Sequence, residues 1–143
     1  MSFNIAESKE FNELSFYSMS HPNREYFIHQ HVVDAYQAQI SNSETKPIAV
    51  IFALLGLYLY LEKGFTGREV QLMHMKIAKN KPVVWPKVVF PGRRGEITIQ
   101  DVLKLESSED KDTMIRNWCE SVWNAYAESQ QTVRDFTNSY RTF

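Results

Sequence analysis

The longest apolar segment of the chain runs from Pro47 to Leu61 (PIAVIFALLGLYLYL) and contains no charged residue. A helix that is apolar on every side either lies inside a protein core or crosses a membrane. A membrane span needs about 20 apolar residues, and this segment is shorter. We therefore predict a helix at the centre of a globular core. It should end at Gly64, because glycine suits the left-handed position that follows a helix.

The segment from Tyr26 to Gln39 (YFIHQHVVDAYQAQ) has polar residues where an ordinary amphipathic helix has core positions. At about 100° per residue, His29 falls on an apolar face with Tyr36, so we expect His29 to point into the core. His31 and Asp34 fall on nearly the opposite side, and their spacing of three lets them touch. The pattern indicates a helix that is covered on two sides.

This helix is expected to run from about Pro22 to Ile40, because proline is tolerated at the first helical position and Ser20 can cap it. Residues 1–19 mix aromatic and polar positions without a long period, which predicts a partly ordered arm. The polar connection Ser41–Thr45 leads from the first long helix into the apolar one.

A third helix is predicted over Thr66–Asn80, since it opens with the capping-box pattern Thr-Gly-Arg-Glu. Residues 81–97 contain three prolines, two glycines and paired valines, which favours an extended crossing. Thr98, followed three residues later by Asp101, indicates a short helix that ends near Leu105.

The last helix should begin between Ser108 and Asp112 and continue to about Tyr140. It has one apolar stripe, formed by Ile115, Trp118, Val122, Tyr126, Val133, Phe136 and Tyr140, together with Ser129. No internal repeat and no pair of alternating strands is visible. We therefore predict a single all-α domain over residues 1–143. It is a four- to five-helix bundle around the buried apolar helix, with one proline-rich extended crossing.

The charge balance argues against nucleic acid as a partner. The chain has 16 Lys and Arg against 17 Asp and Glu, and its net charge of -1 gives no broad attraction for phosphate backbones. Cys119 is the only cysteine, so an intramolecular disulfide is excluded. The first residues lack the basic and apolar regions of a signal peptide. We expect a cytoplasmic protein without membrane contact.

Sets of catalytic or metal-binding residues are incomplete in this sequence. His29 and His31 are about 200° apart on a helix, so they do not have the spacing of paired ligands. His74 could approach His29 through the core. Cys119 lies beside the apolar stripe of the last helix, where a thiol is usually inert. The segment 91–95 (PGRRG) lacks the Lys-Ser/Thr of a nucleotide loop. We predict neither a metal nor a cofactor.

Several motifs follow one another in a fixed order. They are His29-x4-Asp34-Ala35-Tyr36-x2-Gln39, Leu61-Glu62-x-Gly64, Gly95-x2-Thr98-x2-Asp101-Val102 and Trp118-x3-Val122-Trp123-x-Ala125-Tyr126. In these motifs the chain resembles the bacterial family called domain of unknown function 5946, over about Tyr26 to Val133. The resemblance implies a shared fold and a set of recurring positions, without an activity.

The resemblance also implies histidines at three places where this chain has Ile40, Ala53 or a neighbour, and Gln130. Of the implied histidine set, only His29 is present. This departure argues against catalysis, and it makes the shared Asp34, Tyr36, Trp118 and Trp123 look architectural.

Three functional hypotheses remain. The leading hypothesis is a small helical protein that binds a small molecule or a protein partner between its first and last long helices. Its pocket would be lined by His29, Asp34, Gln39, Trp118 and Trp123, since aromatic walls with a few polar groups form ligand pockets. The first alternative is a metal-dependent enzyme of the hydrolase or transferase kind, which needs His29, His31, Asp34 and His74 to converge. The second is a structural or homo-oligomeric role that uses the aromatic residues of the arm and the segment Val83–Phe90.

Overall fold

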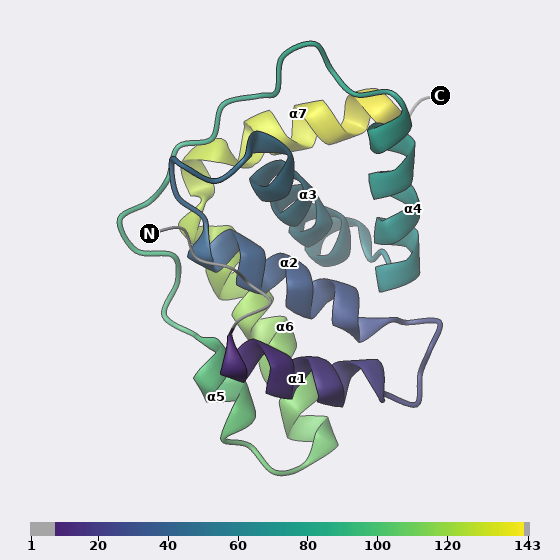
Figure 1. The fold of residues 1–143 in the computed structure, drawn as a ribbon, viewed down its shortest axis with the longest axis vertical. Coiled ribbons are helices and arrows are strands. Elements are labelled where there is room, and N and C mark those ends of the chain that lie inside the picture. The colour runs from purple at the N-terminus through teal and green to yellow at the C-terminus, as the bar shows by residue number, and fades with distance from the viewer. Residues whose placement is uncertain (1–7, 142–143) are drawn as a thin grey trace.

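The structure is a computed structural model that describes residues 8–141, and over these residues the chain is all-α (Figure 1). No strand occurs in this part of the chain, so the predicted all-α class is confirmed. The elements in chain order are α1 (Lys9–Met19), α2 (Ile28–Ile40), α3 (Pro47–Lys63), α4 (Gly67–Lys79), α5 (Ile99–Leu103), α6 (Ser108–Ala125), the 3-10 turn η2 (Ala127–Ser129) and α7 (Gln130–Arg141).

The apolar segment forms α3, which lies in the middle of the fold and contacts α2, α4, α6 and α7 (Figure 1). Most of its side chains are buried, and residues 53–60 are buried without interruption. The helix ends as predicted at Gly64, whose φ is +70° and whose N–H donates to the Leu59 carbonyl. Among the described residues, no helix is both long and apolar enough to cross a membrane.

The first long helix begins later than the sequence pattern suggested. α2 starts at Ile28 rather than near Pro22, because side chains in the preceding loop bond to the backbone. The Asn23 N–H donates to His21 Nδ1, and the Tyr26 N–H donates to Asn23 Oδ1, each at 3.1 Å. Such bonds offer the backbone an alternative to the helical pattern.

Part of the expected N-terminal arm is a regular helix. Residues 9–19 form α1, which is capped by Ser8 through a bond from the Phe11 N–H to Ser8 Oγ. The Phe11 ring stacks on Tyr36 of α2 at 4.9 Å, and Leu14 is completely buried. The sequence pattern did not predict this helix, because its apolar stripe is short. Residues 1–7 of the predicted arm lie outside the described residues.

α4 carries the predicted capping box and lies along one side of α2 and α3 (Figure 1). The Glu69 N–H donates to Thr66 Oγ1, and the Thr66 N–H donates to Glu69 Oε1. These two bonds satisfy backbone donors that the first turn of a helix otherwise leaves free.

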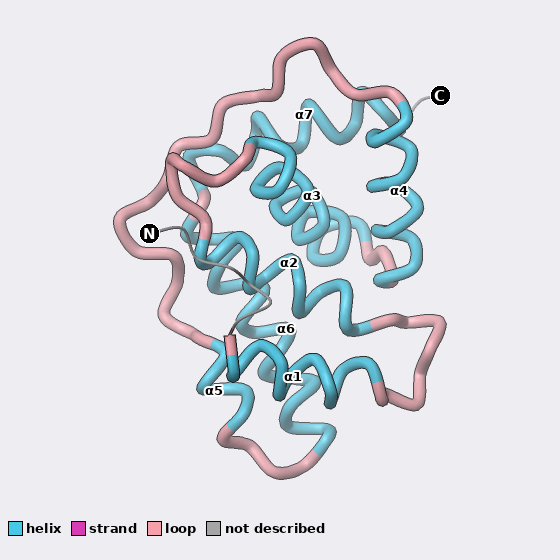
Figure 2. The backbone as a smooth tube through the Cα atoms, in the orientation of Figure 1, coloured by secondary structure: helices cyan, strands magenta, loops and turns pink. Residues whose placement is uncertain are grey.

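Residues 81–97 contain neither helix nor strand and form the long pink loop of Figure 2. Serine side chains hold this loop: the Val89 N–H donates to Ser129 Oγ at 2.8 Å, and the Glu96 N–H donates to Ser121 Oγ at 2.9 Å. Val83 is fully exposed. An interface role for this loop remains a prediction.

The last helix is broken, which the apolar stripe did not indicate. α6 ends at Ala125, and α7 begins at Gln130 after the turn η2. The side-chain amide of Gln130 donates to the Trp123 carbonyl at 2.9 Å, so that carbonyl is satisfied without a continuous helix. Seven of the eight stripe positions are buried in spite of the break: Ile115, Trp118, Val122, Tyr126, Ser129, Val133 and Tyr140.

Candidate functional site

Asp34 projects from α2 toward α3 and is only 2 % exposed. Its Oδ1 accepts a hydrogen bond from Gln30 Nε2 at 3.0 Å, whereas Oδ2 has no hydrogen-bond partner in residues 8–141. Burial raises the pKa of Asp34 well above its usual range, although the bond from Gln30 opposes this effect. This burial favours the uncharged form of the carboxyl. Because Oδ1 already accepts from Gln30, the proton of that form belongs on Oδ2.

Gly56 of α3 provides the space that the Asp34 carboxyl occupies. A Cβ atom at Gly56 would lie 2.6 Å from Asp34 Cγ and closer still to Oδ2. Real Cβ atoms essentially never approach another heavy atom so closely. The glycine in the middle of this helix thus lets an acidic side chain sit between two buried helices.

A cleft of about 200 Å³ opens beside Asp34, where α2, α3 and α4 meet. Its polar lining comes from Gln30, Asp34, Gln37 and His74, and its apolar lining from Val33, Ala49, Phe52 and Ala53. We call this cleft the inner compartment. Four polar side chains with different hydrogen-bonding capacities therefore meet in one small and mainly apolar space.

His74 enters this compartment from α4 in a fixed orientation. Its ring stacks on Phe52 with 4.5 Å between ring centroids, and its Nε2 lies 3.0 Å from the Phe52 carbonyl. A carbonyl only accepts, so Nε2 carries the proton and Nδ1 is an acceptor. Burial lowers the pKa of His74 to about 4, although the bond to the carbonyl opposes the change. His74 is therefore a neutral imidazole at pH 7.

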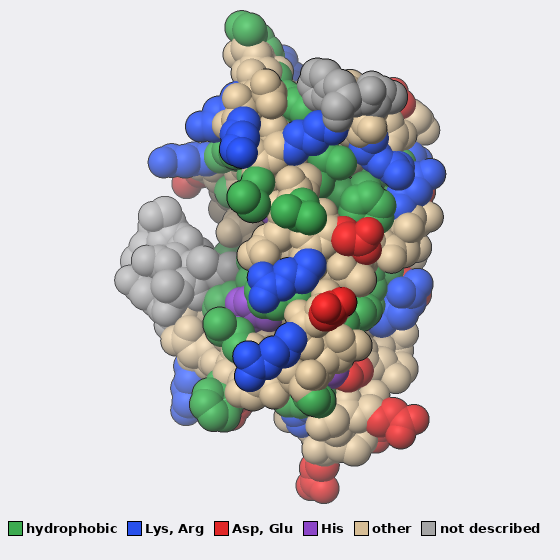
Figure 3. All heavy atoms as spheres, turned by 90° about the vertical axis from the view of Figure 1, so that its right-hand side faces the viewer, with side chains coloured by type: hydrophobic (Ala, Val, Ile, Leu, Met, Phe, Trp, Pro, Cys, Tyr) green, Lys and Arg blue, Asp and Glu red, His purple; other side chains and the backbone are tan. Residues whose placement is uncertain are grey.

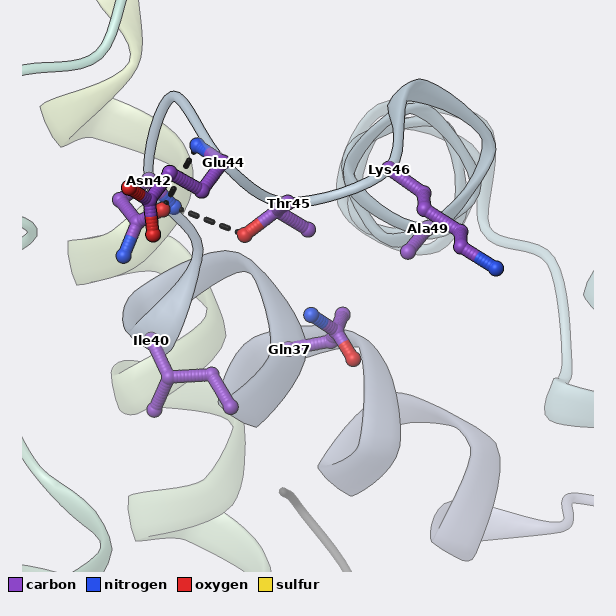
Figure 4. Close-up of a pocket in the computed structure, with 7 residues that line it drawn as sticks. All are labelled: Gln37, Ile40, Asn42, Glu44, Thr45, Lys46 and Ala49. Atoms are coloured by element: carbon purple, nitrogen blue, oxygen red, sulfur yellow. Dashed lines mark hydrogen bonds between the residues drawn. The ribbon is translucent and has the colours of Figure 1, made fainter. Parts of the chain in front are cut away.

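A second hollow of about 340 Å³ adjoins the inner compartment, since Gln37 and Ala49 line both. We call it the outer compartment and the two together the α2–α3 groove. In Figure 4, Gln37 from α2 and Ala49 from α3 face the same space beneath the connecting loop. Bonds from the Glu44 N–H to Asn42 Oδ1 and from the Asn42 N–H to Thr45 Oγ1 fix that loop.

His31 lies in a separate environment from Asp34. It is completely buried and stacks on Tyr60 of α3, with 3.6 Å between ring centroids. The Tyr26 ring packs edge-on against it, and neither ring nitrogen has a hydrogen-bond partner among the described residues. His31 and Asp34 therefore form no hydrogen bond with each other. Burial, together with the nearby charge of Arg116, lowers the pKa of His31 to about 3.

The buried His31 should make the fold sensitive to acid. Between about pH 6.5 and about pH 3, the unfolded chain binds a proton at this histidine and the folded chain does not. Stability should therefore fall as the pH is lowered through this window, by about 2 to 3 kcal/mol at pH 4.5. The variant His31→Phe keeps an aromatic ring on Tyr60 without the titration. Urea unfolding at several pH values should show a flatter profile for the variant, and parallel profiles would contradict this assignment.

Two other predicted binding residues fasten the long loop to the helices. The Gln39 amide donates to the carbonyls of Arg94 and Ile97, at 3.1 and 2.8 Å. Its Oε1 accepts a bond from Trp118 Nε1 at 2.9 Å. Trp118 is completely buried. Gln39 and Trp118 therefore lie together, as a connection between α2, α6 and the loop.

His29 and Trp123 lie in two further places. His29 Nδ1 contacts Ser18 Oγ at 2.8 Å, beside α1, and the ring is half-buried rather than directed into the core. Trp123 Nε1 donates to Glu62 Oε2, which also accepts a bond from Arg134. Of the five residues predicted to line one pocket, only Asp34 lines the groove, and only Gln39 and Trp118 contact each other.

The geometry does not provide the ligand set that the metal-dependent alternative requires. No group of three or more His, Cys, Asp or Glu side chains within residues 8–141 is arranged to hold a metal ion. His74 lies in the groove with Asp34, whereas His29 and His31 lie elsewhere. Of the places where the resemblance implied histidines, Ala53 and Ile40 line the inner and the outer compartment. Gln130 instead bonds to the Trp123 carbonyl.

The sequence did not identify Gln30, Gln37, Phe52 or Gly56 as site residues. A signal for Gly56 was present, because a glycine inside an apolar helix often marks a close approach of another group. The glutamines gave no such signal, since glutamine is common on exposed helix faces. Their role depends on how α3 lies against α2.

One comparison with known proteins gives a match. The model of a family of unknown function (DUF5946) matches residues 8–127, which include α1 to α6 and every residue that lines the α2–α3 groove. No curated protein and no solved structure matches the chain.

Proposed function

The chain belongs to this family of unknown function, and we propose that it binds a small, uncharged polar molecule in the α2–α3 groove. The proposal rests on the geometry of the groove. In the proposed complex, the protonated carboxyl of Asp34 donates a hydrogen bond to the ligand, and the aromatic ring of Phe52 forms an apolar wall.

The main support for this proposal is the carboxyl of Asp34. A buried polar atom without a partner costs about 1 to 3 kcal/mol of stability, and a folded protein satisfies most such atoms. Asp34 Oδ2 is such an atom, and it lies between two central helices beside an open cleft. Strongly shifted ionisable groups beside a cleft are typical of functional sites. We infer that a ligand acceptor completes the bonding of Asp34.

The chemistry of the lining favours an uncharged ligand with an amide-type edge. A protonated Asp34 supplies a donor, and the neutral His74 supplies an acceptor at Nδ1. An ionic ligand would find no opposite charge among the residues that line the inner compartment when Asp34 is protonated and His74 is neutral. The inner compartment, of about 200 Å³, takes the polar group, and the outer one, of about 340 Å³, leaves room for a substituent.

The cytoplasm of a bacterium remains the location that we propose. The free thiol of Cys119 is completely buried, and burial raises its pKa. A protein with one unpaired cysteine does not depend on an oxidising compartment.

Binding of acetamide, 2-pyrrolidone and uracil, measured by saturation-transfer NMR at pH 7, tests the proposed function. We expect saturable binding of at least one of these probes. Removing the donor with Asp34→Ala should weaken binding about tenfold or more, since a hydrogen bond to a buried partner is worth about 1 to 3 kcal/mol. Filling the groove with Ala49→Leu should also abolish the signal.

A matched control is available on α4. Ala78→Leu adds the same atoms at an exposed position away from the groove, so this variant should bind the probes as the natural chain does. Circular dichroism establishes that each variant is folded. Equal binding by the natural chain, Asp34→Ala and Ala49→Leu would contradict the proposed site, as would no binding of any probe.

A further inference from the structure

The loop before α2 contains a strained residue. Phe27 has φ +49° and is the only non-glycine residue in the described chain with a positive φ. A bulky side chain rarely adopts this left-handed conformation, and residues held in it cluster at ligand-binding sites. Contacts around Phe27 must therefore hold the residue in this conformation.

Contacts with the start of α4 hold this conformation in place. The Gly67 N–H donates to the Tyr26 carbonyl at 2.6 Å. A Cβ at Gly67 would lie 2.8 Å from the carbonyl carbon of Phe27 and closer still to its oxygen. Glycine at this position thus lets the loop and the helix approach until their backbones touch. The two segments therefore meet in one closely packed corner.

This corner orients the side chain of Arg68. Its guanidinium lies over the Phe27 ring, 4.3 Å from the centroid, and one of its nitrogens donates to Gln71 Oε1 at 3.2 Å. A guanidinium that stacks on a ring keeps its edge N–H groups free for an acceptor. No carboxylate of residues 8–141 lies within ion-pair distance of Arg68.

A second arginine faces the same hollow. Arg24 and Arg68 both line a pocket of about 180 Å³, whose other walls include Ser18, His21, Asn23 and Phe27. The same two arginines also line a wider adjoining hollow of about 530 Å³. Like Arg68, Arg24 has no ion-pair partner in the described residues. Lys and Arg side chains lie on this face of the molecule, with Asp and Glu side chains among them (Figure 3).

The acidic groups near the pocket are already engaged or lie at its outer edge. Asp112 pairs with His21 Nε2 at 2.7 Å and also accepts a bond from the Tyr17 hydroxyl. Glu69 is held by its bond in the capping box, and Glu25 is exposed in the wider hollow. The two arginines consequently form no ion pair within the described residues, although Glu25 and Glu69 line the wider hollow with them.

We propose that this pocket binds an oxyanion, either a phosphate or a carboxylate group, between Arg24 and Arg68. Arginine matches the planar and tetrahedral oxygens of both groups with paired hydrogen bonds. The Asn23 amide adds a donor, because its Oδ1 already accepts from the Tyr26 N–H. The site is separate from the α2–α3 groove, so it stands or fails independently of the proposed function.

Calorimetric titration of the full chain with inorganic phosphate and, separately, with succinate tests this proposal. The ionic strength is held constant with sodium chloride. We expect saturable binding of at least one probe, and the stronger one identifies the preferred oxyanion. Arg24→Gln and Arg68→Gln should each weaken binding about tenfold or more, because a hydrogen bond to a charged group is worth that factor.

Lys79→Gln is the matched control, since it removes one positive charge from the exposed end of α4 without touching the pocket. Its affinity should stay within about twofold of the natural chain, because exposed charges act weakly at physiological salt. No binding of either probe would overturn the proposal. Equal losses in Lys79→Gln and the two pocket variants would overturn it as well, by showing a nonspecific charge effect.

The variant Phe27→Gly tests whether the Phe27 ring contributes to binding, because it removes the ring while the fold is kept. Glycine adopts the left-handed conformation without strain, which offsets part of the packing lost with the half-buried ring, so the variant should remain folded in thermal unfolding. Without the ring, Arg68 loses its orientation, and the affinity for the preferred probe should fall severalfold. An unchanged affinity in a folded Phe27→Gly variant would contradict the orienting role of the ring.

Discussion

Gly56→Ala should destabilise the protein by about 1 to 3 kcal/mol, although alanine normally stabilises a helix relative to glycine by about 1 kcal/mol. The reason is the Asp34 carboxyl, whose atoms are the three nearest to a Cβ at this position. Asp34 is almost completely buried and is held by Gln30, so it has little room to move aside. Urea unfolding monitored by circular dichroism measures the effect.

Removing the Asp34 carboxyl should reverse the sign of the stability change that Gly56→Ala causes. In an Asp34→Ala background the added methyl group meets none of the atoms that obstruct it, so Gly56→Ala should become neutral or stabilising. The coupling free energy of this double-mutant cycle should then exceed about 1 kcal/mol, as found for residues in direct contact. If Gly56→Ala is equally destabilising in both backgrounds, a group other than the Asp34 carboxyl fills the space beside Gly56, which would contradict the packing of Asp34 against Gly56.

Trp118→Ala should cause the largest loss of stability, about 3 to 5 kcal/mol, since it removes a completely buried indole. The change also leaves Gln39 Oε1 without its donor. Gln39 holds the carbonyls of Arg94 and Ile97, so the long loop should loosen together with the core. Denaturant unfolding gives the total loss, and hydrogen exchange at the loop amides reports the loosening.

Trp118→Phe is the matched variant, because it keeps most of the ring volume and loses the N–H. It should cost about 1 kcal/mol, the net value of a single hydrogen bond. Losses of similar size for the two variants would show that the bond to Gln39, and not the burial of the ring, determines the effect. A loss below about 1 kcal/mol for Trp118→Ala would contradict the burial of this side chain.

The sequence predicted those elements whose signals are local. The uncharged run gave α3 and its end at Gly64, and the capping pattern at Thr66 gave the start of α4. The start of α2 was predicted too early, because the bonds of Asn23 in the preceding loop compete with the helix. The break between α6 and α7 was missed, since a continuous apolar stripe does not reveal where side chains such as Gln130 replace backbone bonds.

The candidate site was only partly predictable, because its residues come from three helices. Asp34 was identified from its position on a doubly covered helix. The contact between Asp34 and Gly56 depends on how closely α2 and α3 approach each other. The residue pattern of a single helix does not predict that distance. Trp118 and Gln39 were expected to line a pocket, but the direct hydrogen bond between them places both in the packed contact with the loop.

The central claim is that the Asp34 carboxyl is uncharged and donates a hydrogen bond to a ligand. Carboxyl-selective ¹³C NMR of the Asp34 side chain, recorded while uracil, 2-pyrrolidone or acetamide is added at pH 7, measures this directly. We predict a signal in the range of protonated carboxyl groups in the free protein, which then shifts in a saturable way with a bound probe. A signal of an ionised carboxylate, or one that no probe moves, would contradict the account.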